Sequence, residues 1–202
     1  MTARPFLIAL TGPSGSGKTS VARLLAAEGA QVSHIRADDF YKDYDTFPKM
    51  GGWINWDVPE NIDFEALRDS LEALRSGKPV HISAFIKDSR ERTPKTLSPS
   101  PVLLVEGFLL LYDASVRDLF DLKIYIDCPR EVQIERRLQR DKIHPREHIE
   151  QVVIPQYEKY GLPTRAYADH VVSSEGDLDA TVSEVRKIIA DYLKRTKVER
   201  AS

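Results

Sequence analysis

A glycine-rich stretch near the start of the chain, residues 12–19, constrains the fold more than any other feature. It reads Gly-Pro-Ser-Gly-Ser-Gly-Lys-Thr and fits the pattern G-x-x-x-x-G-K-T. Its glycines allow positive φ angles and a close approach to a ligand, so successive backbone N–H groups can converge on an anion. In this pattern Lys18 reaches the β- and γ-phosphates of a nucleotide, and the hydroxyl of Thr19 binds Mg²⁺.

The residues on both sides of this loop support a phosphate site. Phe6 to Thr11 is a short apolar run of the kind found in buried parallel strands. From Thr19 to Glu28 apolar residues recur at helical spacing, and Gly29 follows as the expected C-cap. Because strand, loop and helix are all present, we favour a phosphate site over a loop that binds nothing. The expected nucleotide-binding residues are Gly12, Ser14, Gly15, Ser16, Gly17, Lys18, Thr19 and Ser20.

Composition narrows the class of protein. A chain of 202 residues fits a single domain spanning residues 1–202. The formal net charge of −2 gives no sign of a nucleic-acid-binding surface. The single cysteine, Cys128, rules out an intrachain disulfide, and no apolar run approaches the roughly 20 residues of a membrane span. Since Met1 to Arg4 leave no room for a signal peptide, we expect a cytoplasmic protein without a membrane partner.

Apolar runs alternate with helical patterns, which predicts an α/β fold with a mainly parallel sheet. Further strands are expected at 32–35, 102–105, 123–127 and 169–172, and further helices at 62–74, 131–140, 146–160 and 177–193. We expect the 146–160 helix to break near Pro155 and the polar residues from 194 onward to fray.

Two segments do not fit this alternation. Residues 80–85 alternate in polarity and are expected to form one arm of a small hairpin, while 87–101 is a polar return to the core. Between residues 40 and 60, aromatic residues, glycine and proline follow no sustained period. That composition is typical of a functional loop.

One carboxylate directly follows a predicted strand. Glu106 comes after the four aliphatic residues 102–105, so it lies at the carboxyl end of a buried strand, where open α/β sheets bind ligands. There it can hold Mg²⁺ directly or through water. The alternative is a carboxylate that caps the next turn. We therefore predict a metal site formed by Thr19 and Glu106.

Two adjacent carboxylates, Asp38 and Asp39, follow the second predicted strand and belong to the same sheet edge. One of them can accept the proton of a substrate hydroxyl while that oxygen attacks the γ-phosphate. Neighbouring residues on an extended segment point in opposite directions, so only one should face the site. The spacing alone does not choose between them.

Three arginines lie on the predicted helix 131–140. Arg136 and Arg140 are four residues apart and share a face, with Arg137 beside them. Arginines near a γ-phosphate stabilise the charge that spreads over its oxygens in the transition state. The alternative is a solvated basic face, but the position after a core strand favours the catalytic interpretation.

Trp56 and Asp57 stand together in the 40–60 loop. An indole beside a carboxylate suits a nucleoside, because the base can stack on Trp56 while the ribose hydroxyls donate to Asp57. The alternative is that Trp56 fills the core and Asp57 caps the helix ahead. The residues alone leave both interpretations open.

Taken together, these motifs resemble the uridine kinase and nicotinamide riboside kinase family of P-loop nucleoside kinases. The resemblance runs to about Val172 and is carried by an ordered set of segments: GPSGSGKT at 12–19, DDFYK at 38–42, NWDVPE at 55–60, VEGFLL at 105–110, RRLQRD at 136–141 and LPTRAYAD at 162–169. Many NTPases contain a P-loop, whereas this ordered set is far more specific. The fold implied is a P-loop NTPase three-layer sandwich with a five-stranded parallel core sheet, a small hairpin and a helical lid.

The resemblance also implies roles for individual residues. Asp38 matches the general base and Glu106 matches the Mg²⁺ site. Asp57 matches the residue that binds the ribose hydroxyls, and Trp56 stands in the place of a base-stacking aromatic. Lys42 falls where the family has a basic residue near the substrate.

Basic residues of the lid follow in the same way. Arg137 and Arg140 match lid positions that close over the phosphates, and we expect both to take part in catalysis with Lys18. Arg137 is also expected to contact the substrate. The lid should span about 136–150 and the substrate loop about 40–60.

The reaction implied is phosphorylation of the 5′-hydroxyl of a small ribonucleoside, with ATP and Mg²⁺ as cofactors. Residues 55–64 and 106–110 look more like riboside kinases, whereas 116–120 and 162–169 look more like uridine kinases. The 80–90 hairpin is short, with Phe85 as its only aromatic residue. We therefore place nicotinamide riboside slightly ahead of uridine or cytidine, and a monomer or dimer ahead of a tetramer.

Two alternatives belong to other classes. One is a kinase of another small alcohol, such as pantothenate, glycerate or ribulose phosphate, which would not need Trp56 and Asp57 as a nucleoside platform. The other is a non-catalytic nucleotide-binding regulator. The presence of Lys18, Asp38 and Glu106 together argues against a regulator.

Overall fold

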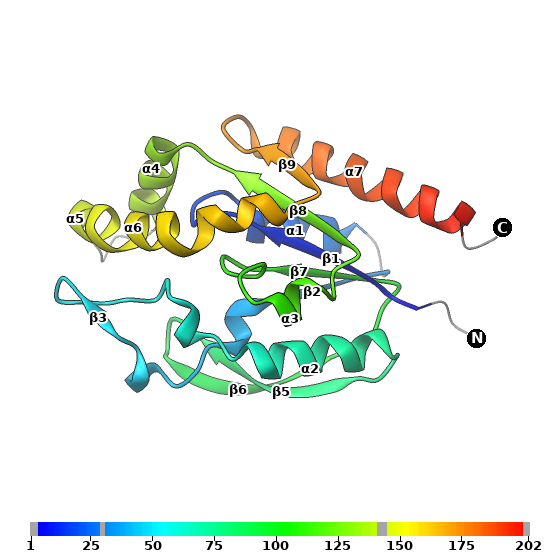
Figure 1. Cartoon of the computed structure of the whole chain (residues 1–202), viewed down its shortest axis with the longest axis horizontal. Coiled ribbons are helices and arrows are strands. Elements are labelled where there is room, and N and C mark those ends of the chain that lie inside the picture. The colour runs from blue at the N-terminus through cyan, green and yellow to red at the C-terminus, as the bar shows by residue number, and fades with distance from the viewer. Residues whose placement is uncertain (1–3, 29–30, 141–144, 200–202) are drawn as a thin grey trace.

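The computed structural model describes residues 4–28, 31–140 and 145–199. Five parallel strands form a central sheet in the order β2-β7-β1-β8-β9 (Figure 1). Their bounds are β1 Phe6–Thr11, β2 Val32–Arg36, β7 Val102–Glu106, β8 Leu122–Asp127 and β9 His170–Ser173. All residues of β1 and β7 are buried, which is why these strands are continuous apolar runs in the sequence.

Helices cover both faces of this sheet. On one face, α1 (Lys18–Ala27) and α7 (Leu178–Glu199) pack against a core that includes Ile8 and Leu10 of β1. On the other face, α2 (Phe64–Arg75) and α3 (Ala114–Arg117) pack against a second core that includes Leu7 and Ala9. Successive residues of β1 thus alternate between two cores, and the predicted three-layer sandwich is confirmed.

The carboxyl ends of three neighbouring strands bring the predicted site residues to one edge of the sheet. Strand β1 leads into the glycine-rich loop, β2 leads into the turn with Asp38, and β7 ends at Glu106. In the sheet register Glu106 lies beside Leu10 of β1 and Arg36 of β2. Parallel pairing therefore joins three segments that are far apart in the chain.

Two small antiparallel hairpins lie outside the central sheet. Strands β5 (Val80–Ile86) and β6 (Glu91–Leu97) form one, and β3 (Lys49–Met50) and β4 (Trp53–Ile54) form the other within the 40–60 loop. The predicted first arm of a hairpin is confirmed, but its second arm falls within 87–101, which we expected to be a polar return. Pro94 is tolerated there because both strands of a two-stranded sheet are edges.

Helix α4 (Arg130–Arg140) precedes a continuous helical segment from residue 146 to residue 161. This segment contains α5 (Arg146–His148) and α6 (Ile154–Gln156), with π-helical turns at 149–153 and 157–161. The predicted break near Pro155 is wrong. The N–H of Ile154 donates to the carbonyl of Ile149, five residues back, and the wider turn accommodates a residue that has no N–H to donate.

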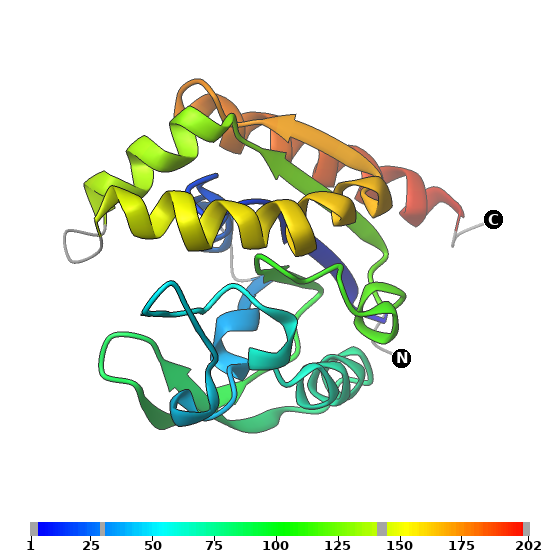
Figure 2. The same ribbon diagram turned by 60° about the vertical axis from the view of Figure 1, so that its left-hand side comes forward.

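The 146–161 segment runs alongside the 40–60 loop (Figure 2). Gln156 donates to the sulfur of Met50 at 3.1 Å, and the His148 and Trp53 rings lie 5.6 Å apart. The β3–β4 hairpin therefore packs against the helical segment.

Some sequence predictions concern chain ends and caps. Helix α7 continues to Glu199, so the expected fraying from residue 194 is wrong for 194–199, where no glycine or proline interrupts residues of good helix propensity. The expected C-cap Gly29 and the lid residues 141–144 lie outside the described residues. Within the described part of the chain, no helix has both the length and the apolar character needed to cross a membrane.

Candidate active site

The glycine-rich loop joins β1 to α1 at the carboxyl edge of the sheet. Gly12 has a φ of 137°, and a Cβ atom built there would lie 2.2 Å from the carbonyl oxygen of Ile126. Only glycine satisfies both the angle and the space. Gly17, at the other end of the loop, is the N-cap of α1, so the positive end of that helix points into the loop.

Lys18 begins α1 and is buried. Its ammonium donates a hydrogen bond of 2.8 Å to the carbonyl of Pro13, inside the loop. Burial lowers the pKa of Lys18, and the carboxylates of Glu106 and Asp38 oppose that shift. Ser16 is also buried, and its hydroxyl makes no hydrogen bond within the described part of the chain. The loop therefore has polar groups available for a bound anion.

Glu106 and Thr19 are in contact, as a shared metal site requires. Thr19 Oγ1 donates to Glu106 Oε1 at 3.0 Å. His34 Nε2 and Arg36 Nε, both from β2, lie 3.8 and 4.0 Å from the same oxygen. Burial raises the pKa of Glu106, but His34, Lys18 and Thr19 more than offset it and hold the pKa below its ordinary value. Glu106 is therefore ionised at neutral pH.

This pair has the chemistry of a magnesium site completed by substrate. Among the described residues, no three His, Cys, Asp or Glu side chains gather to hold a metal unaided. Mg²⁺ in nucleotide sites takes one or two protein oxygens and fills its shell with phosphates and water. The hydroxyl of Thr19 and the carboxylate of Glu106 fit that requirement.

Asp38 and Asp39 lie in a 3-10 turn, Ala37–Phe40, and not in the extended segment that we expected. They nevertheless face different surroundings. The Asp39 side chain is 5% exposed and accepts a hydrogen bond of 2.6 Å from Lys95 of β6. The Asp38 side chain is 33% exposed, with Arg36 Nη2 3.9 Å away. Asp39 is thus held by a lysine, and Asp38 is the more accessible carboxylate.

Charged groups around Asp38 connect it to the phosphate loop. Burial raises the pKa of Asp38, and Glu106 raises it further. Lys87 is the strongest opposing charge, followed by Arg36 and Lys18. Asp38 is therefore within electrostatic range of both Lys18 and Glu106.

Helix α4 brings its arginines to the glycine-rich loop. Arg137 donates to Ser14 Oγ at 2.7 Å, and Arg140 donates to the same atom at 3.4 Å. Arg136 donates to the loop carbonyl of Gly15 at 3.3 Å and to the carbonyl of Ser174 at 2.7 Å. Arg137 is only 7% exposed, whereas Arg140 is exposed, so the basic run is buried against the loop at Arg137 and solvated at Arg140. The arginines that share a partner are thus Arg137 and Arg140.

Trp56 is half-buried in an aromatic cluster. Four rings lie within 6.0 Å of its own, those of Tyr41, Tyr44, Phe47 and Phe85. Asp57 is buried, and its charge acts on Lys18 and Tyr41. It does not cap the following helix, because Asp63 is the N-cap of α2. The structure thus brings Asp57, Asp38 and Lys18 into one neighbourhood beside Trp56.

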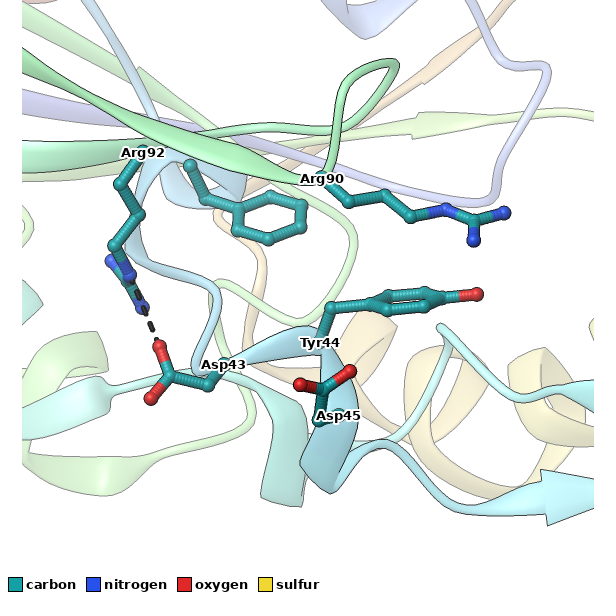
Figure 3. A pocket seen from close by; sticks show the side chains of 6 residues that line it. Asp43, Tyr44, Asp45, Arg90 and Arg92 are labelled. Carbon is teal, nitrogen blue, oxygen red and sulfur yellow. Dashed lines mark hydrogen bonds and ion pairs between the residues drawn. The ribbon is translucent and has the colours of Figure 1, made fainter.

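Two cavities flank this neighbourhood. A cavity of about 230 Å³ lies between the glycine-rich loop, Arg136 and the 174–181 segment, and Ser20 lines it. A second cavity, of about 430 Å³, lies between the 43–45 segment and the β5–β6 hairpin (Figure 3). There the Arg90 guanidinium lies 4.4 Å from the centre of the Tyr44 ring, and Arg92 pairs with Asp43 at 3.2 Å.

Other basic residues lie around the site. Lys42 is exposed, and its backbone N–H donates to the carbonyl of Asn61. Its expected role near the substrate stays a prediction. Lys87, Arg92 and Lys95 near the site were missed, because 87–101 did not resemble a strand. In the structure, partly buried or buried residues of β6 alternate with exposed ones up to Leu97, but the partly buried ones are Thr93 and Lys95, so the sequence shows no apolar alternation there.

The site combines a phosphate loop, an ionised carboxylate that accepts a hydrogen bond from the loop threonine, and arginines from a neighbouring helix. This combination defines a P-loop phosphotransferase. The model of the phosphoribulokinase / uridine kinase family matches residues 7–181, and the chain belongs to this family.

Named relatives agree with that membership. The chain is 32% identical over 208 residues to a uridine kinase of Streptococcus gordonii, covering 95% of this chain and 99% of that protein. It is 32% identical over 211 residues to uridine-cytidine kinase 2-B of Danio rerio, covering 94% and 81%. A solved structure of a possible uridine kinase from Bacillus stearothermophilus has the same fold, with a TM-score of 0.63 at 22% identity, covering 85% of this chain and 90% of that chain. The protein is an ATP-dependent kinase that phosphorylates a hydroxyl group, which excludes a non-catalytic regulator.

Proposed function

We propose that the protein phosphorylates the 5′-hydroxyl of a ribonucleoside. The observation that carries this proposal is the grouping of Asp38 and Asp57 near Lys18, beside the half-buried Trp56. A ribonucleoside offers a ring for the indole, ribose hydroxyls that donate to a carboxylate, and a primary hydroxyl that can be deprotonated. The names of the relatives, uridine kinase and uridine-cytidine kinase, support the same class of acceptor.

On the donor side, we assign the triphosphate of ATP to the loop at 12–19. Lys18 would exchange its bond to Pro13 for the β- and γ-phosphate oxygens, and the 230 Å³ cavity would take the nucleoside part of ATP. Bound Mg²⁺ neutralises phosphate charge, and Thr19 and Glu106 are the residues that would hold it.

On the acceptor side, Asp38 accepts the proton of the 5′-hydroxyl as that oxygen bonds to the γ-phosphorus. The bond from this phosphorus to the β–γ bridging oxygen breaks, and ADP leaves. Asp39 is less suited to this role because Lys95 already holds it. Arg137 and Arg140 reach the loop at Ser14, where their charge can stabilise the transferring group. Asp57 orients the ribose.

The proposal does not by itself specify which base the ribonucleoside carries. The preference for nicotinamide riboside stays a prediction, and neither of the two named relatives described above supports it. Their names favour uridine or cytidine as acceptor. The cytoplasmic location, the lid at 136–150 and the monomeric or dimeric state also stay predictions.

A coupled assay of ADP release tests the proposal. Uridine, cytidine, nicotinamide riboside, pantothenate, glycerate and ribulose 5-phosphate would be compared as acceptors, with ³¹P NMR to identify the product. We expect turnover with at least one ribonucleoside and a 5′-monophosphate as product. 5′-Deoxyuridine is the matched control, because it keeps the base and the ribose hydroxyls but has no group to phosphorylate. Turnover restricted to pantothenate, glycerate or ribulose 5-phosphate would contradict the proposal.

A further inference from the structure

The turn between β5 and β6 directs one side chain inward. Residues 87–90 form this turn, and Ile86, Asp88 and Arg90 are exposed. Lys87 is the half-buried member. A lysine that gives up contact with water in an otherwise exposed turn needs a compensating interaction.

That interaction is with the aromatic cluster. Lys87 Nζ lies 4.7 Å from the centre of the Trp56 ring and 6.0 Å from that of Tyr41. An ammonium is attracted to the electron-rich face of an indole. Within the described part of the chain, Lys87 forms no ion pair with a carboxylate, so its charge is not neutralised by a direct partner.

The rest of the proposed acceptor site treats all ribonucleosides alike. Asp38 is assigned to the 5′-hydroxyl and Asp57 to the ribose hydroxyls, and both groups are common to every ribonucleoside. Both carboxylates act on Tyr41, whose ring lies 5.7 Å from that of Trp56, so the ribose and the base share one compact neighbourhood. A base that stacks on Trp56 would meet the Lys87 ammonium, which lies 4.7 Å from the centre of the Trp56 ring.

We propose that Lys87 determines specificity for the base: it favours a neutral base with a ring carbonyl and rejects a cationic ring. This inference rests on the proposed ribonucleoside acceptor. The ring carbonyls of uracil and cytosine accept hydrogen bonds, and Lys87 retains N–H donors to give them. Nicotinamide in its riboside is a pyridinium cation, which would lie against a second positive charge. The contact therefore reverses the order of acceptors expected from the sequence.

A matched pair of acceptors isolates the charge of the ring. Nicotinamide riboside and its 1,4-dihydro form share the ribose and the carboxamide, but only the oxidised form is cationic. We expect the wild-type kcat/KM to be at least about tenfold higher for the neutral form, and for uridine, than for the cation. Lys87→Met keeps the apolar stem and should bring the two forms within about threefold, whereas Lys87→Glu should favour the cation.

Two further variants control for structural effects. Lys87→Arg keeps the positive charge and should keep the wild-type ratio. Arg90→Asn removes a positive charge from the same turn, where asparagine tolerates the φ of 61°, and should also leave the ratio unchanged.

The outcomes separate this inference from the proposed function. If the wild type uses both forms equally well, or if Lys87→Met leaves the ratio unmoved, the role of Lys87 is wrong while the ribonucleoside acceptor stands. If the wild type phosphorylates no ribonucleoside, the proposed function fails and this inference fails with it.

Discussion

The proposed donor and acceptor halves of the site are built by different means. The donor half is one continuous stretch, 12–19, whose shape depends on backbone angles and on the space around Gly12. The acceptor half is assembled from three separate segments: the turn with Asp38, the loop with Trp56, and the hairpin with Lys87. Side-chain contacts hold these segments together. Mutations in the donor half should therefore act through backbone strain, and mutations in the acceptor half through lost side-chain contacts.

The largest effect should come from the carboxylate that joins the two halves. Asp38→Asn should lower kcat by about 10²- to 10⁴-fold, because it removes the proposed base. Binding of a non-hydrolysable ATP analogue, measured by calorimetry, should stay near wild type, since the donor half is intact. Asp39→Asn is the matched variant, with rates corrected for the folded fraction. Retained turnover in Asp38→Asn together with lost turnover in Asp39→Asn would show that the base is misassigned.

Gly12→Ala should break the donor half through its backbone. The new Cβ would meet the Ile126 carbonyl oxygen at 2.2 Å, so we expect a loss of about 3 kcal/mol or more in unfolding free energy, together with weak ATP binding. Gly52→Ala in the acceptor loop is the control, because its φ is also positive, at 85°, but nothing lies within 4 Å. Gly52→Ala should lower the free energy of unfolding by about 1 kcal/mol, because only the positive φ angle is unfavourable there. Urea unfolding of both variants measures the difference, and equal losses would contradict it.

The acceptor half should respond to the loss of its inter-segment contacts. Lys95→Met leaves the buried Asp39 with only the longer contact to Arg36 at 4.0 Å and should cost about 1–3 kcal/mol of stability. The double variant Asp39→Asn/Lys95→Met should recover part of that loss, because no unpaired charge remains. A complete double-mutant cycle by chemical denaturation tests this coupling. Strictly additive effects would mean that the pair does not hold β6 to the Asp38 turn.

The smallest effect concerns pH. Asp38 must be ionised to act as a base, and burial raises its pKa, so the acid limb of kcat/KM should lie above the ordinary aspartate value of about 3.9. Lys87 is the strongest charge that lowers this pKa. The Lys87→Met variant removes that charge, so the pKa of Asp38 should rise further and the acid limb should move to higher pH. Rate profiles between pH 4 and 8 measure the shift, and a move to lower pH would contradict the arrangement.

Much of the fold could be predicted because buried parallel strands are apolar throughout and the phosphate loop is local in sequence. Lys18, Thr19 and Glu106 follow from one motif and one strand end. By contrast, Lys95 and Asp39 are 56 positions apart, and nothing local indicates that they meet. The position of Lys87 over Trp56 likewise depends on how the hairpin folds back. The predicted break at Pro155 was wrong because proline usually interrupts i→i−4 hydrogen bonding, whereas here a π-helical turn with an i→i−5 hydrogen bond precedes it and the helix continues.

The β5–β6 hairpin has one end in the core and the other in the site. Leu97 is buried in the core beneath the sheet, with Val80 and Ile82 packed against it, while the turn at 87–90 is mostly in solvent. Insertions and deletions in a solvent-exposed turn cost a fold little. If the proposed role of Lys87 holds, substitutions or length changes in this turn should alter the choice of acceptor while leaving the phosphate loop and its ATP binding intact.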